Sequence, residues 1–401
     1  MKVGYNFWGF LGDKKYSKDG ELLSTPDGNA FYSWSIIKEL LKRGCKVYNM
    51  MPDRDFPGIC IEKDNLFSSW CQNDRLDSYL RQIFTFDYKL KTKSFCNITK
   101  QDLFDVWDDF EVYNFDFILH EWRMEIPGRN DLESRYEWKW QPDLFIQQCV
   151  LEYCKLHNII LIIFDLDYKF NENEVSLGDN IHVFELGNKF SGKEWADKVY
   201  IPFDFSCINE FEPKLYNFDD YSNNLVYIGN RYERDWCIDK YIPTEMKNVI
   251  VYGNWKESGR DSEKRWPNIK FGDRLQTSDM YDVYSNSIAT ILLAKKDYCE
   301  NQFMTARIIE AIFYCTVPLF IEEYGDDCIL DYAGAYSKLL TVRSKGDVID
   351  VVYKLKHNSL LRHNIIYYLR KRLSKFMDVK FFVDKCFSVL VKKGEKNNDL
   401  Q

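Results

Sequence analysis

The stretch IILIIFDLD, residues 159–167, decides which fold this chain is expected to adopt. Its first six residues are apolar, and such a run predicts a strand buried on both faces, as in a parallel sheet that is covered by helices. The preceding stretch PDLFIQQCVLEYCKLHN, residues 142–158, has the apolar spacing of a helix. A helix that leads into a doubly buried strand is the repeating unit of an α/β fold.

The same alternation continues through most of the chain. Strands are expected at residues 2–7, 45–50, 115–121, 181–186, 225–229, 249–254, 288–294 and 317–323, and further helices at residues 30–44, 359–376 and 380–393. Gly44 stands where a glycine would end the first of these helices. The pattern is that of parallel sheets with helices packed on both faces.

A polar stretch with two prolines, residues 202–224, interrupts this pattern before it starts again. The 401 residues also exceed the length of about 250–300 at which single cores stop growing. We therefore expect two domains, one of residues 1–205 plus about 378–401 and one of residues 212–377. The expected fold class is α/β, with two Rossmann-like domains facing each other across a cleft and the C-terminal helix returning to the first domain.

The composition argues against several classes of protein. A net charge of −8 disfavours a protein that coats nucleic acid non-specifically, although it allows a local basic groove. Twelve cysteines and five histidines are scattered without zinc-ligand spacing, which suits reduced thiols and no zinc site. The first residues lack a secretion-signal pattern, and no run of about 18 apolar residues occurs. We therefore expect a cytoplasmic protein outside membranes, and we expect a monomer.

Arg307 and Glu310 lie three residues apart in NQFMTARIIEAIFYCTVPLFIEE, residues 301–323, and share one face of a helix that leads into a strand. One interpretation is a surface ion pair that contributes at most about 1 kcal/mol. The other is that Arg307 binds a diphosphate through its planar guanidinium while Glu310 accepts hydrogen bonds from a ribose diol. The pair alone does not decide between them.

Two other stretches suit a nucleotide. LVYIGNRYER, residues 225–234, puts Gly229 and Asn230 at a strand end, where the backbone can approach a phosphate, and Arg231 and Arg234 would add positive charge. The alternative is an ordinary glycine turn with solvated arginines. The loop FGDRLQ, which contains Leu275, either offers backbone groups to a nucleobase or simply connects two elements.

Asp165 and Asp167 come directly after the apolar run at residues 159–164, at the end of the predicted buried strand. A carboxylate at a strand tip can take a proton from an acceptor hydroxyl. The two residues also form a D-x-D pair, which single-domain glycosyltransferases use to hold a metal ion at a nucleotide-sugar. A third interpretation is that both are ordinary turn residues.

Taken together and in this order, these stretches resemble the two-domain (GT-B) glycosyltransferases, and among them the phage DNA beta-glucosyltransferases. The similarity is clearest at residues 225–323, through YGN, FGDRLQ followed by YSNS, NQF, T-x-R-x-x-E and FIEE. It is fainter in the first half, where NAFYSWSIIKEL matches the first helix and PDLFIQQCVLEY precedes FDLD.

The resemblance implies a role for each matched residue. Arg307 would bind the diphosphate and Glu310 the uridine ribose. Asp167, or else Asp165, would be the catalytic base. The remaining donor-binding positions would be Gly229, Asn230, Arg231, Arg234, Leu275, Gly9 and Asn29. Two differences stand out, since the family spaces its phosphate arginines differently and has an acidic residue where this chain has Asn29.

The resemblance further implies a hexosyltransferase that moves a sugar, with glucose expected, from a UDP-sugar to a hydroxymethylated base in phage duplex DNA. The base would be a 5-hydroxymethylpyrimidine, 5-hydroxymethylcytosine above all, and the transfer an inverting direct displacement. The UDP-sugar is then a co-substrate, no covalent cofactor is needed, and a divalent cation, Mg²⁺ or Mn²⁺, is compatible with the scheme. The residues expected to contact duplex DNA are Lys89, Lys91 and Lys93, in the basic stretch DYKLKTKSFCNITK, and Arg123. The alternative is that this lysine run is a solvated face.

Three alternatives stay open at the level of the sequence. One is a UDP-sugar-dependent glycosyltransferase that acts on a glycan, a lipid or a small molecule. Another is a nucleotide-sugar-binding protein without catalysis. The third is a single-domain, metal-dependent transferase built around the D-x-D pair, which the second α/β half of the chain disfavours.

Overall fold

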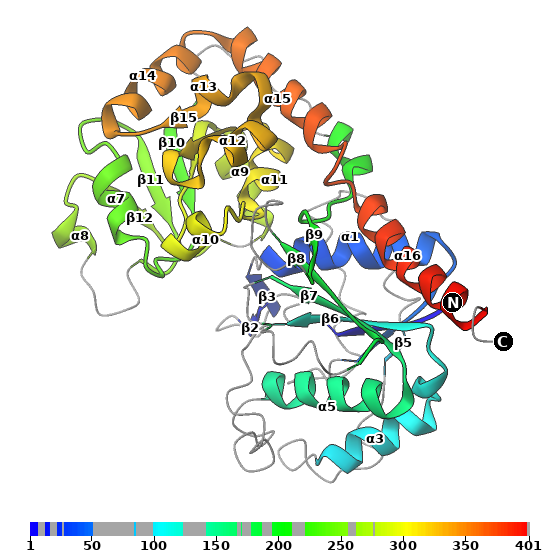
Figure 1. Ribbon diagram of the computed structural model, residues 1–401. Helices are drawn as coiled ribbons and strands as arrows, with labels where there is room; N and C mark the ends of the chain where they lie inside the picture. The colour runs from blue at the N-terminus through cyan, green and yellow to red at the C-terminus, as the bar shows by residue number, and fades with distance from the viewer. Residues whose placement is uncertain are drawn as a thin grey trace.

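Two parallel sheets form the framework of the molecule (Figure 1). The structure is a computed structural model and describes residues 1–6, 13–16, 22–25, 28–50, 84–85, 99–122, 142–166, 170, 178–186, 195–210, 221–255, 262–275 and 277–398. The strands of the first sheet lie within residues 2–199 and those of the second within residues 223–342. The domain boundaries expected from the sequence are compatible with this division and remain a proposal.

Within the described residues, the first sheet has seven strands in the order β5-β4-β1-β6-β7-β8-β9, all parallel. They are β1 (Lys2–Asn6), β4 (Lys46–Asn49), β5 (Phe84–Thr85), β6 (Phe117–Trp122), β7 (Ile160–Asp165), β8 (Ile181–Leu186) and β9 (Asp197–Val199). Every residue of β6 and β7 is buried. For β7 this confirms the prediction made from the apolar run at residues 159–164. In a separate two-stranded sheet, β2 (Asp13–Tyr16) pairs with β3 (Leu22–Thr25) in the antiparallel sense.

Helices cover both faces of the first sheet (Figure 1). One face carries α1 (Gly28–Lys42) and α16 (Val379–Asn398), and the other carries α3 (Lys100–Asp109) and α5 (Pro142–His157). Alternate residues of β6 divide between the two faces. Leu119 joins the core under α1, whereas Ile118 joins the core under α5.

The second sheet repeats the same plan, with the parallel order β12-β11-β10-β13-β14-β15. Its strands are β10 (Asn223–Ile228), β11 (Val249–Tyr252), β12 (Lys270–Gly272), β13 (Ser287–Leu292), β14 (Val317–Ile321) and β15 (Thr341–Val342). Its helices are α7 (Asp235–Tyr241), α8 (Ser262–Arg265), α9 (Thr277–Ser285), α10 (Lys296–Glu300), α11 (Arg307–Phe313), α12 (Asp326–Ala333), α13 (Ser337–Leu340), α14 (Lys345–Lys356) and α15 (Ser359–Leu373). This is the strand order of a Rossmann-like sheet.

The chain crosses between the two sheets at two places that lie side by side. Phe203 N donates to Met377 O at 2.8 Å, and Val379 N donates to Phe203 O at 2.8 Å. Beyond this point α16 runs back along α1 (Figure 1), and Arg43 pairs with Asp384 of α16 at 2.5 Å. The expected return of the C-terminal helix to the first sheet is therefore confirmed.

Local signals explain where α1 ends and where α3 begins. Gly44 follows α1 with φ of +77° and ends that helix as predicted. Helix α3 was not expected, although Thr99 and Asp102 form the reciprocal hydrogen bonds of a capping box that the sequence T-x-x-D could have announced. The stretch before β14 is helical at Lys296–Glu300 and Arg307–Phe313, with Gln302 at a φ of +52° between the two helices.

Candidate functional site

The carboxyl end of β10 is the point at which the strand order of the second sheet reverses. The strands β11 and β12 lie on one side of β10, and β13, β14 and β15 lie on the other. In open parallel sheets, ligands bind in the crevice at such a reversal. Gly229 follows β10 directly, and Arg307 begins the helix α11 that comes after β13 along the chain.

The backbone at this reversal is tightly packed around two glycines. Gly229 N donates to Tyr252 O at 2.9 Å, and the Gly229 carbonyl accepts from Trp255 Nε1 at 2.8 Å. A side chain on Gly229 would overlap the guanidinium of Arg307 and the hydroxyl of Tyr227. Gly253 has a φ of +139°, and a Cβ there would overlap the Gly229 carbonyl. Both glycines are therefore needed for the close approach of these turns.

Arg307 points back across the end of β10. Its Nε donates to the carbonyl oxygen of Ile228 at 2.5 Å, and its guanidinium carbon lies 5.4 Å from the ring centroid of Tyr227. The side chain is partly buried. The guanidinium is thus held beside Gly229, at the switch point, in a position to receive an anion.

Glu310 lies one turn along the same helix and is buried, with 7% of its surface exposed. It accepts a hydrogen bond from Tyr284 Oη at 3.2 Å. Burial raises the pKa of the Glu310 carboxyl, while Arg307 and the Tyr284 hydrogen bond oppose that rise. The carboxylate keeps acceptor capacity for a further donor such as a ribose hydroxyl.

Arg234 is a second cation near Arg307, and it is buried. It is 4% exposed, and its Nη1 donates to the carbonyl oxygens of Asn230 and Tyr232, both at 3.2 Å. Among the described residues its Nε has no hydrogen-bond partner, and the same holds for the hydroxyl of Tyr324. Tyr324 lies within electrostatic reach of both Arg234 and Arg307, so the three side chains form one neighbourhood.

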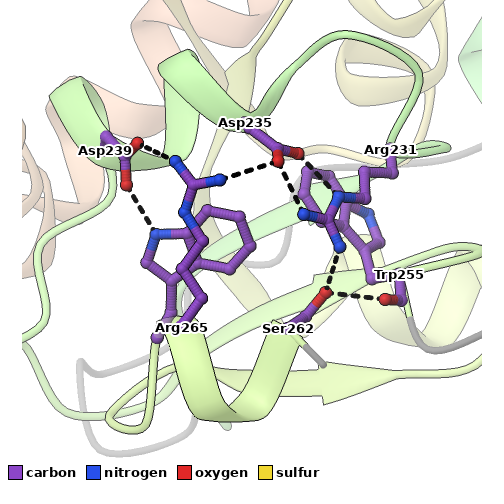
Figure 2. Close-up of polar contacts among 7 residues, drawn as sticks. Arg231, Asp235, Asp239, Trp255, Ser262 and Arg265 are labelled. Carbon is purple, nitrogen blue, oxygen red and sulfur yellow. Dashed lines mark hydrogen bonds and ion pairs between the residues drawn. The ribbon is translucent and has the colours of Figure 1, made fainter. Parts of the chain in front are cut away.

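Arg231 is engaged in a different network, which Figure 2 shows. Its Nε and Nη2 donate to the two carboxylate oxygens of Asp235, each at 2.6 Å, and its Nη1 donates to Ser262 Oγ at 3.0 Å. Arg265 bridges Asp235 and Asp239 on the other side, at 3.0 and 2.5 Å. All three donor atoms of the Arg231 guanidinium are therefore occupied within the protein.

The other predicted positions vary in what the structure says of them. Asn230 accepts from Arg234 through its carbonyl, Leu275 is partly buried three residues after β12, and Asn29 lies in the first turn of α1. The positions that lie outside the described residues are Gly9, Lys89, Lys91, Lys93, Arg123 and Asp167. Their predicted roles stay predictions.

Asp165 lies at the carboxyl end of β7 and is fully buried. Its Oδ2 accepts from Phe170 N at 2.9 Å, and it stands in register with Glu185 of β8. Glu185 in turn stands in register with Lys198 of β9 and forms an ion pair with it. Burial lowers the pKa of Lys198 to about 8, and the nearby Asp165 opposes that shift. Asp165 is therefore part of a buried charged row across three strands.

The first sheet also contains two polar residues that the sequence reasoning did not single out, Asn6 in β1 and His120 in β6. Both are buried at the point where the strand order of this sheet reverses. The signal that could have found His120 is a histidine, followed by Glu121, inside a strand whose other residues are apolar. An asparagine at the end of the first strand is a weaker signal.

Across the described ranges, no group of three or more His, Cys, Asp or Glu side chains could hold a metal ion. Over that same part of the chain, no helix is both long and apolar enough to traverse a bilayer. The cysteines that the structure describes are free thiols.

No protein-family model matches the chain, and no curated protein matches it by sequence. Solved structures do match. T4 phage BGT in complex with UDP and Mn²⁺ superposes with a TM-score of 0.55 at 15% identity, covering 97% of this chain and 99% of that one. An alpha-glucosyltransferase in complex with UDP and a 13-mer DNA containing an HMU base gives 0.56 at 13% identity, covering 98% and 99%.

A third match has a different activity in its name. Sucrose-phosphate synthase from Thermosynechococcus elongatus superposes with a TM-score of 0.53 at 10% identity, covering 100% of this chain and 99% of that one. At such low identities the likeness concerns the fold. Over nearly its whole length, the chain has the two-domain GT-B fold of these glycosyltransferases, as its resemblance to the phage enzymes predicted.

Proposed function

We propose that this chain is a UDP-sugar-dependent glycosyltransferase. The observation that carries the proposal is the pair of arginines, Arg234 and Arg307, beside the hydroxyls of Tyr227 and Tyr324 at the carboxyl end of β10. Among the described residues, Arg234 Nε and both hydroxyls have no hydrogen-bond partner. Buried donors without acceptors are costly, and a diphosphate supplies both the charge and the acceptor oxygens that would satisfy them.

Of the two arginines that the sequence offered after β10, Arg234 is the better phosphate ligand. Arg231 has all its guanidinium nitrogens engaged with Asp235 and Ser262. Recruiting it to a phosphate would break a bidentate ion pair that is largely buried. We therefore assign the diphosphate to Arg307 and Arg234, and the fold-stabilising role to Arg231.

The nucleoside would lie beyond Glu310 and Leu275. Glu310 is buried on the same helix as Arg307, one turn away, and its carboxylate can accept hydrogen bonds from the two ribose hydroxyls. Leu275 follows β12 and would meet the base through its backbone groups. In this arrangement one short helix, α11, binds both the diphosphate and the ribose.

The reaction would be a direct displacement at the anomeric carbon. We assign the base to Asp167, because Asp165 is fully buried and already accepts from Phe170 N. The carboxylate of Asp167 takes the proton of the acceptor hydroxyl, the hydroxyl oxygen bonds to the anomeric carbon, and the bond from that carbon to the β-phosphate oxygen breaks. UDP leaves with the bonding electrons, and the configuration inverts.

Arg307 and Arg234 would stabilise the departing UDP, whose negative charge grows as that bond breaks. T4 phage BGT has been solved with Mn²⁺. The described residues of this chain offer no cluster that fits such an ion, so we derive no step through a metal. In this proposal the two arginines neutralise the negative charge that develops on the leaving UDP.

For the acceptor we propose a 5-hydroxymethylpyrimidine, with 5-hydroxymethylcytosine first, in duplex DNA of a phage and thus in the host cytoplasm. The support is the matching fold of an alpha-glucosyltransferase solved with DNA that contains an HMU base. The net charge of −8 favours the second candidate, a glycan, lipid or small-molecule acceptor. The two candidates share the donor site and differ only in the first half of the chain.

Labelled UDP-glucose, incubated with the protein and duplex DNA, tests this proposal. We expect label to enter duplexes that contain 5-hydroxymethylcytosine and not matched unmodified duplexes. Transfer to oligosaccharide or lipid hydroxyls but not to either DNA would favour the second candidate. Binding of UDP without transfer to any hydroxyl would contradict the enzyme and leave a nucleotide-sugar-binding protein.

A further inference from the structure

Asn6 and His120 occupy the switch point of the first sheet. β1 and β6 are the neighbouring strands at which its strand order reverses, and Asn6 stands in register with His120 across them. Asn6 is the last residue of β1, and His120 lies two residues before the end of β6. Side chains in register on parallel strands point to the same face, so the two lie next to each other.

Both side chains are buried without satisfying their polar atoms. Asn6 is 1% exposed and His120 is 3% exposed. Among the described residues, neither amide atom of Asn6 and neither ring nitrogen of His120 has a hydrogen-bond partner. Buried polar groups are nearly always paired in folded proteins, so two adjacent exceptions at a switch point call for a ligand.

The chemistry of the pair is neutral. Burial lowers the pKa of His120 to about 3, so its imidazole is uncharged at neutral pH and carries one donor and one acceptor. The carboxamide of Asn6 likewise donates and accepts. The ring of His120 packs edge to face with that of Trp122, with 5.9 Å between the ring centroids. A hydroxyl group, which also donates and accepts, matches this pair better than a phosphate or a carboxylate does.

We propose that Asn6 and His120 form a hydroxyl-binding subsite for the uncharged sugar or alcohol that reacts in the first half of the molecule. The inference rests on the proposed glycosyltransferase function and extends it to a second set of residues. Two sources share this chemistry, the hydroxyls of the donor sugar and the hydroxyl of the acceptor. The pair would discriminate against carboxylate-bearing sugars, because neither residue supplies a positive charge.

The test uses the full chain with Asn6→Leu and His120→Phe, which keep the approximate shape and remove the polar atoms. Each variant should be as stable as the wild type or more so, because it replaces unpaired polar groups with apolar ones. Affinities for UDP and for UDP-glucose would be measured by calorimetry, and the acceptor KM by transfer. If the pair binds the donor sugar, the ratio of the affinity for UDP-glucose to the affinity for UDP should fall about tenfold, while the affinity for UDP itself stays unchanged.

Asn180→Leu is a matched control in the same sheet. Asn180 is 6% exposed and lies at the amino end of β8, where its Nδ2 donates to Cys154 O at 3.1 Å and Ile159 O at 2.6 Å. This change should lower the melting temperature and leave the ratio of the two affinities unchanged. It separates loss of a buried amide from loss of a ligand contact.

The outcomes distinguish this inference from the function on which it rests. A tenfold rise in acceptor KM with an unchanged affinity ratio would support the subsite and assign it to the acceptor. The subsite alone would be overturned if both variants still bind UDP and keep the wild-type acceptor KM and the wild-type ratio of affinities for UDP-glucose and UDP. Failure of the wild type to bind UDP and UDP-glucose would overturn both the proposed function and the subsite.

Discussion

The carboxyl ends of the two sheets have the same strand topology and opposite chemistry. At the end of β10, Arg307 and the hydroxyl of Tyr227 lie against Gly229, and Tyr324 lies within electrostatic reach of Arg307 and of a second arginine, Arg234. At the ends of β1 and β6, the buried pair is an asparagine and a neutral histidine. Farther along the first sheet, the charged row contains two carboxylates and one lysine.

This difference teaches how a duplicated fold can divide a reaction between its halves. A group-transfer reaction has a charged leaving group on one side and a neutral hydroxyl nucleophile on the other. Arginine forks stabilise the first, while neutral donors and acceptors and a carboxylate base suit the second. Each sheet has one reversal of strand order, and the side chains at the two reversals make them different.

The largest effect should come from removing the positive charge at β10. Arg307→Ala takes away the guanidinium beside Gly229, so we expect kcat/KM for the UDP-sugar to fall by about 10²–10³. Steady-state transfer assays measure this, and urea unfolding checks that the fold persists. Normal turnover in this variant would return Arg307 and Glu310 to a merely structural role.

Substitution of a second arginine, Arg231, should cost a similar free energy, but in the stability of the fold and not in UDP binding. Arg231→Ala breaks the bidentate pair with Asp235 and the bond to Ser262, so the free energy of unfolding should fall by about 3 kcal/mol. Denaturant titration measures the loss. The affinity of the folded fraction for UDP should stay close to that of the wild type. Lost UDP affinity at unchanged stability would instead make Arg231 the phosphate ligand.

The first sheet should respond to acid through His120. Its pKa in the folded state, about 3, is below its unfolded value of about 6.5, so the unfolded chain binds the proton first as the pH falls. Between pH 6.5 and pH 4.5 this linkage should remove about 2 kcal/mol of stability. His120→Phe should lose correspondingly less over the same range in urea titrations. Parallel losses in both proteins would mean that His120 is not kept neutral by burial.

The smallest expected effect concerns the far end of α11. Arg370, which is 9% exposed, donates through Nε to Ile312 O at 2.8 Å and through Nη2 to Phe313 O at 2.9 Å, and so holds the last carbonyls of the helix that carries Arg307. Without these two hydrogen bonds, α11 should shift and carry Arg307 with it. Arg370→Ala should therefore weaken UDP binding by about tenfold, or about 1.4 kcal/mol.

Arg370→Lys keeps one donor and the charge, so it should recover part of the UDP affinity that Arg370→Ala loses. Calorimetric titration with UDP measures both variants under the same conditions. Equal affinities in wild type, Arg370→Ala and Arg370→Lys would show that α11 keeps its place without this contact.

Much of the fold followed from the sequence because it is written in local patterns. The run at residues 159–164 predicted a doubly buried strand, and β7 is buried throughout. Gly44 predicted the end of α1. Helix α3 was not predicted, although the capping box of Thr99 and Asp102 is a local signal for its start.

The donor site was only partly predictable. Arg231 and Arg234 look equivalent in the sequence, since both follow Gly229 within a few residues. Their difference arises from Ser262, which is distant in the chain and takes the third donor of Arg231. The predicted acceptor positions at Lys89, Lys91, Lys93 and Arg123 lie outside the described residues and stay predictions.

The sequence by itself determined the alternation of helices and strands and the helix that carries Arg307 and Glu310. These depend on hydrophobic period and on turn residues, which act within a few positions of the chain. Only the tertiary structure decided which polar groups are already paired and which are not. It places Asn6 beside His120 on two neighbouring strands, where both lack partners among the described residues, and it pairs Arg231 with Asp235 and Ser262. Such pairing depends on contacts between distant segments, and no local pattern encodes them.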